Sequence, residues 1–237
     1  MIDLRQGDCF EIMKNIPDKS IDCIICDPPY NIGYAQWDNL FNIENALIEC
    51  KRILKTDGNI LIFQGYSNVC QTKNIMDKLF NFQDWIIYGR IKGRGGKKHL
   101  VSTREDILWY TNGDNYTFNK IPSTIIKKTG GLGKKNGCKY RALSNVWTDI
   151  SPLVPWCEER KKYKHPTQKP YKLVERLVLL FTNEDDTILD FTMGTGVVGE
   201  ASCKNNRNFI GIELDQKYFE IAKERIYKAQ HEDKGEE

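Results

Sequence analysis

The pattern of apolar and polar positions predicts strands and helices that alternate along most of the chain. Short apolar runs bounded by turn residues are typical of buried strands, and apolar residues three or four positions apart are typical of helices that pack on a sheet. The predicted strands cover residues 21–26, 59–63, 84–91, 105–111, 187–190 and 207–212, and the predicted helices cover 43–55, 68–80, 172–182, a segment from 197 onward, and 216–229. This alternation predicts an α/β fold with a mostly parallel, twisted sheet and helices on both faces.

Turn and cap residues set several of the predicted boundaries. Asp57-Gly58 predicts a turn before the strand at 59–63, and Ser67 and Asp215 are typical N-caps for the helices that follow them. Between residues 112 and 145 the periodicity gives way to glycines and lysines. We interpret this stretch as an insertion or a loop region.

Charge is distributed unevenly along the chain. Residues 90–169 contain 18 Lys and Arg against 6 Asp and Glu, a net charge of +12, whereas the whole chain carries only +3, so that the remaining residues sum to −9. A basic block in an otherwise acidic protein indicates contact with a polyanion, because Lys and Arg that neutralise phosphates supply most of the nonspecific affinity for nucleic acid. A solvated loop region is the alternative interpretation.

Cysteine usage and hydropathy bear on the compartment. The eight cysteines lack the short regular spacings of a secreted disulfide framework. Cys23 and Cys26 have zinc or redox spacing, but alternation along a strand sends them to opposite faces of a sheet, so we predict core packing and no metal. With no apolar leader and no run long enough to cross a bilayer, the sequence favours a soluble, cytoplasmic protein without a membrane partner.

The four residues Asp27-Pro28-Pro29-Tyr30 follow the predicted strand 21–26 directly. The carboxyl ends of strands are where open α/β sheets bind their ligands. A carboxylate, two rigid prolines and an aromatic ring suit a flat molecule that carries an amino group, such as a nucleobase. An ordinary turn, with Asp27 as a cap and Tyr30 as packing, is the alternative.

A second motif, Asp190-Phe191-Thr192-Met193-Gly194-Thr195-Gly196, follows the strand 187–190. Glycines at such a turn let the backbone bend sharply and let a ligand approach without meeting a Cβ atom. Glu213 ends the next predicted strand, 19 residues beyond Gly194, where a carboxylate is expected to bind ribose hydroxyls. The pair predicts a cofactor that contains a nucleoside.

These two motifs, together with the sequence His-Pro-Thr-Gln-Lys-Pro at residues 165–170, resemble those of the amino-methylating DNA methyltransferases that use S-adenosylmethionine. The resemblance covers nearly the whole chain. The catalytic motif precedes the cofactor motif, with the basic region between them, an order similar to that of the β class. The resemblance therefore implies a Rossmann-like methyltransferase fold with a circularly permuted motif order and a basic inserted recognition region.

The resemblance also implies roles for individual residues. Asp27, Pro28, Pro29 and Tyr30 are the expected catalytic residues: Asp27 and the Pro28 carbonyl would accept the two N–H groups of the target amine, and Tyr30 would stack on a base rotated out of the duplex. Glu213 would bind the ribose, Asp8 would meet the adenine of the cofactor, and Thr167 and Lys169 would help hold its methionine carboxylate. The full set expected to bind the cofactor is Asp8, Asp27, Thr167, Lys169, Asp190, Phe191, Thr192, Gly194, Gly196 and Glu213.

DNA contacts are expected in the basic region and in the loop after the catalytic motif. Glycines at 93, 95 and 96 would let a basic loop approach a groove closely, and phosphate contact is favoured over base reading. Trp37, in the loop 31–39, would close over the flipped base. The residues expected to contact DNA are Trp37, Arg90, Lys92, Arg94, Lys97, Lys98 and Arg104.

The sequence thus predicts a site-specific enzyme that methylates the exocyclic N6 of adenine in double-stranded DNA. Aspartate at the head of the catalytic motif favours adenine, and N4 of cytosine is the nearest alternative. RNA methylation, protein-glutamine methylation, an NAD-binding Rossmann dehydrogenase and a catalytically silent DNA-binding module are further alternatives. Family analogy adds a homodimer and a cognate restriction endonuclease as expected partners. We expect one methyltransferase domain over residues 1–230, with 90–165 as its basic DNA-recognition region and 231–237 as a polar tail.

Overall fold

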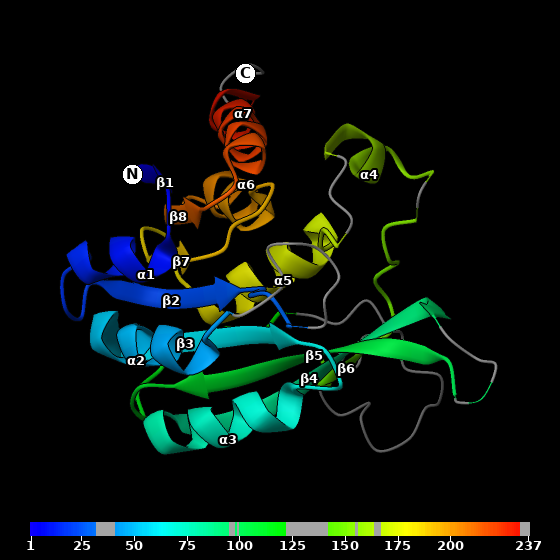
Figure 1. Ribbon diagram of the computed structural model, residues 1–237, viewed down its shortest axis with the longest axis horizontal. Coiled ribbons are helices and arrows are strands. Elements are labelled where there is room, and N and C mark those ends of the chain that lie inside the picture. Colours follow the sequence, from blue (N-terminus) through cyan, green and yellow to red (C-terminus); the bar gives the residue numbers. More distant parts are fainter. Residues whose placement is uncertain are drawn as a thin grey trace, which may run out of the picture.

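The computed structural model describes residues 1–31, 41–94, 98, 100–121, 142–154, 156–163 and 167–232, with the side chains of 91–94 and 232 left aside. This part of the chain forms one eight-stranded sheet in the order β1-β8-β7-β2-β3-β5-β4-β6 (Figure 1). The strands are β1 (Ile2–Gln6), β2 (Ile21–Cys26), β3 (Leu54–Gln64), β4 (Asn81–Arg94), β5 (Ser102–Thr111), β6 (Val146–Trp147), β7 (Thr187–Asp190) and β8 (Asn208–Glu213).

Helices connect the strands and cover both faces of the sheet. They are α1 (Cys9–Ile12), α2 (Ile43–Ile53), α3 (Val69–Leu79), α4 (Glu158–Tyr163), α5 (Tyr171–Phe181), α6 (Val197–Lys204) and α7 (Gln216–Glu232), with a short 3-10 turn at Met13–Asn15. Figure 1 places β1 and α7, the first and last of these elements along the chain, in the same part of the molecule. In the described residues, no helix combines the length and the apolar character that crossing a membrane requires.

The predicted parallel sheet is confirmed. All strand pairs are parallel except those that β5 makes with its neighbours β3 and β4. The antiparallel direction of β5 matters for function, because it brings the amino end of β5 to the edge where the parallel strands have their carboxyl ends.

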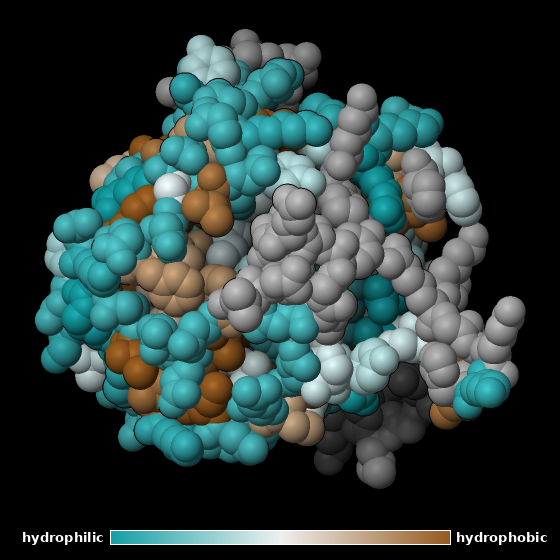
Figure 2. Space-filling view, viewed as in Figure 1, coloured by the Kyte–Doolittle hydropathy of each residue, from teal (hydrophilic) through white to brown (hydrophobic). Residues whose placement is uncertain are grey.

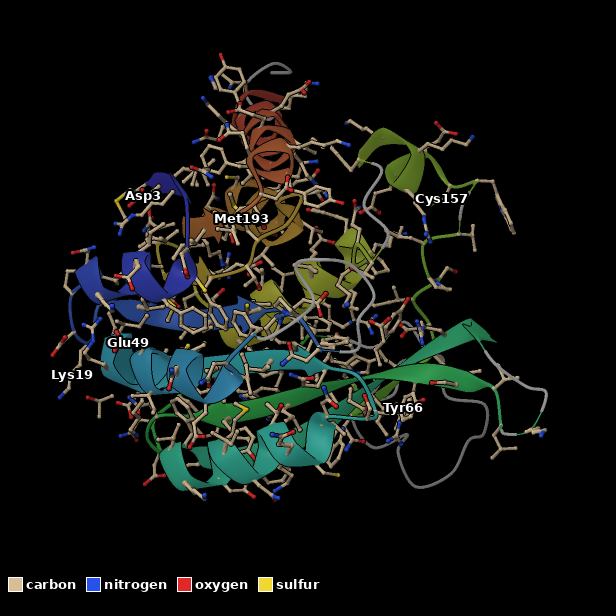
Figure 3. The ribbon with its side chains drawn as sticks, viewed as in Figure 1. Asp3, Lys19, Glu49, Tyr66, Cys157 and Met193 are labelled. Atoms are coloured by element: carbon tan, nitrogen blue, oxygen red, sulfur yellow. The ribbon has the colours of Figure 1, made fainter. Side chains whose placement is uncertain are left out.

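Two layers of apolar side chains lie on the two faces of the sheet. Residues of α1, α2 and α3 form one layer, which includes Cys26, and residues of α5, α6 and α7 form the other, which includes Cys23. The predicted opposite orientation of these cysteines is therefore confirmed. Met193 lies in the second layer, close to α6 and β8 (Figure 3). On the face shown in Figure 2, hydrophilic residues dominate and apolar residues surface only in separate small patches.

Several predicted boundaries were wrong. The structure has no turn between α2 and β3 at Asp57-Gly58, because β3 already begins at Leu54 and passes through both residues with a register shift against β2. Ser67 does not cap α3, which begins at Val69 with Asn68 at the cap position. Asp215 does cap α7, since its carboxylate accepts the backbone N–H of Tyr218 at 3.0 Å.

The sequence pattern missed four short elements: β1, β6, α4 and the four-residue helix α1. β1 lies at the edge of the sheet, where it pairs with β8. Because an edge strand is partly exposed to solvent, the polar residues Asp3, Arg5 and Gln6 can interrupt its apolar pattern without the free-energy cost of burying them. β6 has two residues and α4 has six, which is too short for a periodicity to appear.

Candidate active site

The motifs that are far apart in the sequence meet at one edge of the sheet. β1, β8, β7, β2 and β3 are adjacent and parallel, so their carboxyl ends lie together. Asp27 directly follows β2, the glycine turn follows β7, Glu213 ends β8, and Gly7-Asp8 follows β1. Adjacency of β2 and β7 therefore places the predicted catalytic motif beside the predicted cofactor motif, at the edge where open α/β sheets bind ligands.

Both carboxylate oxygens of Asp27 accept hydrogen bonds. The Tyr30 hydroxyl donates to Oδ1 at 2.5 Å, and the Lys169 ammonium donates to Oδ2 at 2.6 Å. Asp27 keeps 26% of its side chain exposed, so a ligand can still reach it. Burial raises the pKa of Asp27, against the opposing effect of the Lys169 charge, and leaves it above its ordinary value.

Tyr30 is fixed by contacts with the segment between β3 and α3. The side-chain amide of Asn68 donates to its backbone carbonyl, and its ring lies against Gly65, where a Cβ atom would come within 3.2 Å of the ring carbon Cδ2. Burial raises the pKa of Tyr30 well above its ordinary value, and the nearby charges of Asp27 and Glu105 add to the rise. The hydroxyl therefore stays protonated and acts as a donor to Asp27. Stacking of Tyr30 on a flipped base stays a prediction.

Lys169 is buried in the site. Only 6% of its side chain is exposed, and its ammonium lies over the rings of Phe63 and Tyr30, at 5.2 and 5.7 Å from their centroids. The nearest oxygen is Oδ2 of Asp27, so the structure places this lysine on the predicted catalytic carboxylate. Its predicted contact with the methionine carboxylate of a cofactor stays a prediction.

Glu105, at the amino end of β5, is the site residue that the sequence analysis missed. One of its oxygens, Oε2, lies 3.4 Å from the Lys169 ammonium, and the other, Oε1, lies 3.0 Å from Nη1 of Arg90 on β4. Arg90, predicted to contact DNA, is thus paired with a carboxylate of the site. In the sequence, Glu105 is marked only as one of two adjacent acids within the basic block.

The glycine turn bends sharply, as the motif predicted, and its two glycines have left-handed backbone conformations. Gly194 and Gly196 have φ angles of 54° and 76°. The backbone N–H of Gly194 donates to the Glu213 carboxylate at 2.8 Å, and the N–H of Asp215 donates to its other oxygen at 2.8 Å. Glu213 therefore fixes the turn to the end of β8.

Thr192 joins the glycine turn to the catalytic motif. Its hydroxyl lies 3.0 Å from the Cys26 sulfur and 3.4 Å from the backbone carbonyl oxygen of Asp27, and its N–H donates to Asp190 at 3.2 Å. Burial raises the pKa of Asp190 to about 7. Phe191, also buried, stacks in parallel with Phe41 at 6.4 Å between ring centroids.

Asp8 completes this edge from the β1 side. It caps α1, accepting the N–H of Phe10 at 2.8 Å, while the N–H of Gly7 donates to the backbone carbonyl of Glu213 at 2.9 Å. Gly7 has a φ of 144°, and a Cβ atom there would come within 3.1 Å of Ile12. The predicted adenine contact of Asp8 stays a prediction.

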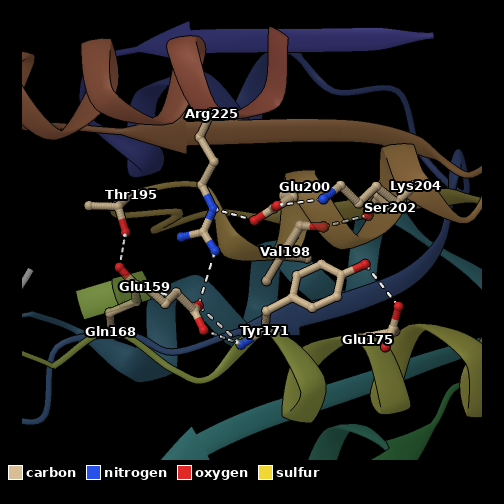
Figure 4. A network of polar contacts seen from close by, with 10 residues as sticks. All are labelled: Glu159, Gln168, Tyr171, Glu175, Thr195, Val198, Glu200, Ser202, Lys204 and Arg225. Carbon is tan, nitrogen blue, oxygen red and sulfur yellow. Dashed lines mark hydrogen bonds and ion pairs between the residues drawn. The ribbon is translucent and has the colours of Figure 1, made fainter. Parts of the chain in front are cut away.

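A polar network links the segment before α5 to the glycine turn (Figure 4). The Thr195 hydroxyl donates to the amide oxygen of Gln168 at 3.2 Å, and the amide nitrogen of Gln168 donates to Glu159 at 2.8 Å. Fully buried Arg225 donates to Glu159 at 3.2 Å and to Glu200 at 2.6 Å. Thr167, beside Gln168, is exposed at the surface.

The predicted DNA-contacting residues are only partly described. Trp37 and Lys97 lie outside the described residues, as do the side chains of Lys92 and Arg94 on β4. Lys98 is exposed, and Arg104 lies 3.4 Å from Asp106 with about half of its side chain exposed. Their roles stay predictions. The described residues hold no group of three or more His, Cys, Asp or Glu side chains arranged to bind a metal ion.

Comparison with known proteins agrees with this geometry. The family described as DNA methylases, N6_N4_Mtase, matches residues 21–224. The chain is 33% identical over 236 residues to the type II methyltransferase M.HpaI of Haemophilus parainfluenzae, covering 93% of this chain and 72% of the relative. It is 31% identical over 246 residues to the DNA adenine methyltransferase YhdJ of Escherichia coli (strain K12), covering 95% of this chain and 82% of the relative.

Solved structures show the same fold. The M1.HpyAVI–SAM complex aligns with a TM-score of 0.69 at 27% identity and covers 95% of this chain and 100% of that one. The cytosine-N4-specific PvuII DNA methyltransferase aligns with a TM-score of 0.73 at 17% identity, covering 94% of this chain and 86% of that one, which shows the fold alone. The predicted Rossmann-like methyltransferase fold is confirmed, and the chain belongs to the DNA methylase family of amino-methyltransferases.

Proposed function

We propose that this protein transfers a methyl group from S-adenosylmethionine to the exocyclic N6 of adenine in double-stranded DNA. The observation that carries the proposal is the position of Asp27, at the carboxyl end of β2 and next to the glycine turn that follows β7. An amine bound at Asp27 lies beside the turn predicted to hold the cofactor, so donor and acceptor are brought together by adjacent strands.

The residues at this edge fit S-adenosylmethionine. The nucleoside part of the cofactor carries hydroxyl and amino donors, and the ends of β8, β7 and β1 offer the carboxylates of Glu213, Asp190 and Asp8 as acceptors. At Gly194 and Gly196 the left-handed backbone carries no side chain that would block a ligand. When bound, the cofactor supplies an electrophilic methyl group on its sulfonium.

The chain's own residues position the amine. The exocyclic amine is a weak nucleophile because its lone pair is delocalised into the ring. Asp27 and the backbone carbonyl of Pro28 each accept one N–H, which favours a pyramidal nitrogen and stabilises the positive charge that develops on it. Proline suits this position because it fixes φ and offers only an acceptor. Tyr30, held by Asn68 and Gly65, orients the Asp27 carboxylate through its hydroxyl.

Adenine is favoured over cytosine by two observations. Aspartate heads the catalytic motif, and a relative of 31% identity carries the name DNA adenine methyltransferase. We further propose that the basic region between residues 90 and 165 binds DNA phosphates, that the protein works in the cytoplasm without a metal, and that it forms a homodimer. Because relatives carry the name type II methyltransferase, we also propose a cognate endonuclease as a companion enzyme.

Nucleoside analysis tests the proposal directly. The protein is incubated with S-adenosylmethionine and unmethylated bacterial genomic DNA, which contains every short target site, and the DNA is digested to nucleosides for mass spectrometry. We expect N6-methyldeoxyadenosine with the wild type and none with Asp27→Ala. N4-methyldeoxycytidine would overturn the choice of base. Methylation of added RNA alone, or of neither polymer, would overturn the proposed function.

A further inference from the structure

Lys169 has three oxygen neighbours in a buried pocket. Its ammonium lies 2.6 Å from Oδ2 of Asp27, 3.4 Å from Oε2 of Glu105 and 3.4 Å from the Tyr30 hydroxyl. Burial lowers the pKa of Lys169, but the charges of Asp27 and Glu105 outweigh this effect and leave the pKa above its ordinary value. The ammonium is therefore charged, and it has one close carboxylate partner and one more distant partner.

Glu105, the more distant carboxylate, has one oxygen that can still accept a hydrogen bond. Arg90 is paired with Oε1 of Glu105, while Oε2 is buried and accepts no hydrogen bond from the described residues. At 3.4 Å this oxygen is in ion-pair contact with the Lys169 ammonium but lacks a close hydrogen bond, so it can accept one if the ammonium moves toward it.

Both oxygens of Asp27, the closer carboxylate, already accept hydrogen bonds. Tyr30 donates to one oxygen of Asp27 and Lys169 donates to the other, at 2.5 and 2.6 Å. An amine that arrives as a hydrogen-bond donor must compete with one of these groups. Tyr30 is fixed by its backbone contacts, whereas a lysine side chain can turn about several bonds.

We propose that Lys169 is a positioning residue shared by two carboxylates: it holds Asp27 in the free enzyme and moves to Oε2 of Glu105 when the target amine reaches Asp27. The inference rests on the proposed function, because it needs an amine as the incoming donor. No proton moves in this step, and Lys169 stays charged throughout. The transfer leaves the negative charge of Asp27 uncompensated at the moment when positive charge develops on the amine nitrogen, which favours the transition state.

The charged and titratable groups around Lys169 come from several elements. Asp27 and Tyr30 follow β2, Glu105 belongs to β5, and Arg90 and Tyr88 belong to β4. At the end of β7, Asp190 also faces Asp27, whose charge adds to the rise in the pKa of Asp190. The charges of Lys169 and Glu105 act on the pKa of Asp27 in opposite directions, so removal of either one shifts the titration of Asp27.

The test uses Glu105→Gln, with Asp106→Asn as the matched control. Asp106 is the next residue on β5, is fully buried and is also a carboxylate, but it lies on the other face of the sheet, where it accepts a hydrogen bond from the indole of Trp85. Methyl transfer is measured from labelled S-adenosylmethionine to unmethylated genomic DNA over a range of pH. Cofactor binding is measured by calorimetry without DNA, and melting curves check that each variant folds.

We expect Glu105→Gln to lower kcat about tenfold, because Lys169 loses its alternative partner and stays on Asp27. Without the charge of Glu105 the pKa of Asp27 falls, so the acid limb of the pH profile moves to lower pH. Lys169→Met should lower kcat about 100-fold and move the acid limb to higher pH, and Lys169→Arg should restore part of the rate. Cofactor affinity should remain that of the wild type in all three variants.

If the wild type methylates DNA, two results would overturn this inference and leave the proposed function intact. One is a Glu105→Gln enzyme whose kcat and pH profile match those of Asp106→Asn. The other is a Lys169→Met enzyme that binds S-adenosylmethionine more weakly with an unmoved acid limb, which would assign this lysine to the cofactor. A wild-type enzyme that leaves DNA unmethylated would overturn the proposed function and, with it, the inference.

Discussion

Replacing Asp190 by Asn should make the protein more stable at neutral pH, although the residue belongs to the predicted cofactor site. Asp190 is 3% exposed, and burial raises its pKa from 3.8 to about 7. A rise of about three units, at about 1.4 kcal/mol per unit, corresponds to about 4 kcal/mol that the folded protein loses when this carboxylate is ionised. Asn has nearly the same shape, cannot ionise, and keeps an oxygen to accept the N–H of Thr192.

The direction in which stability changes with pH follows from the number of protons that the folded and unfolded states bind. Between about pH 4 and pH 7 the folded protein holds a proton on Asp190 that the unfolded chain has released, so stability falls as the pH rises through this window. Asp190→Asn removes this dependence. The free energy of unfolding of Asp190→Asn should therefore exceed that of the wild type by about 3 kcal/mol more at pH 8 than at pH 5.

Urea unfolding at a series of pH values measures the difference. The control is Asp18→Asn, which removes one negative charge from a side chain that is 72% exposed. Calorimetry should show weaker binding of S-adenosylmethionine to Asp190→Asn, because a carboxylate acceptor is lost. The reasoning about burial would be refuted if Asp190→Asn were no more stable than the wild type at pH 8, or if the difference did not change with pH.

Two further predictions concern the turn and the network beside it. Gly196→Ala should destabilise the protein by about 2–5 kcal/mol, because alanine is strained at a φ of 76° and its Cβ would lie 2.9 Å from that of Ala222; an unchanged urea midpoint would contradict this. Arg225→Met should cost about 3–5 kcal/mol because it removes the buried cation that joins Glu159 and Glu200. Lys228→Met, on the same helix but 44% exposed, should change stability by less than about 1 kcal/mol. Equal melting temperatures for these two variants would argue against a structural role for the network.

The parts of the fold that the sequence predicted are those with a local signal. Residues 21–26 and 187–190 coincide with β2 and β7, because central parallel strands are continuous apolar runs. The motifs that follow these strands could be identified for the same reason, since a polar or glycine-rich segment after a buried strand marks a ligand edge. β1 gave no such signal, because an edge strand tolerates polar residues.

The parts that the sequence did not predict depend on contacts between distant segments. Glu105 reaches the site only because β5 runs antiparallel and begins at the carboxyl edge of its neighbours. Nothing in the pattern around residue 105 indicates that direction. The contact between Lys169 and Asp27 spans 142 positions, and that between Arg225 and Glu159 spans 66. Such pairs follow from the strand order, which the sequence pattern leaves open.

Strand order also explains how one residue can belong to both halves of the site. β2 and β7 pair directly, with Cys23 opposite Ile188 and Ile24 opposite Leu189, so the segments that leave these two strands start side by side. Thr192 touches the backbone of Asp27 on one side and Asp190 on the other. A ligand that displaces the glycine turn therefore acts on a side chain that contacts the backbone carbonyl of Asp27, the predicted catalytic aspartate. Because both motifs are fixed by adjacent parallel strands, their order along the chain is free to change while their relative position is kept.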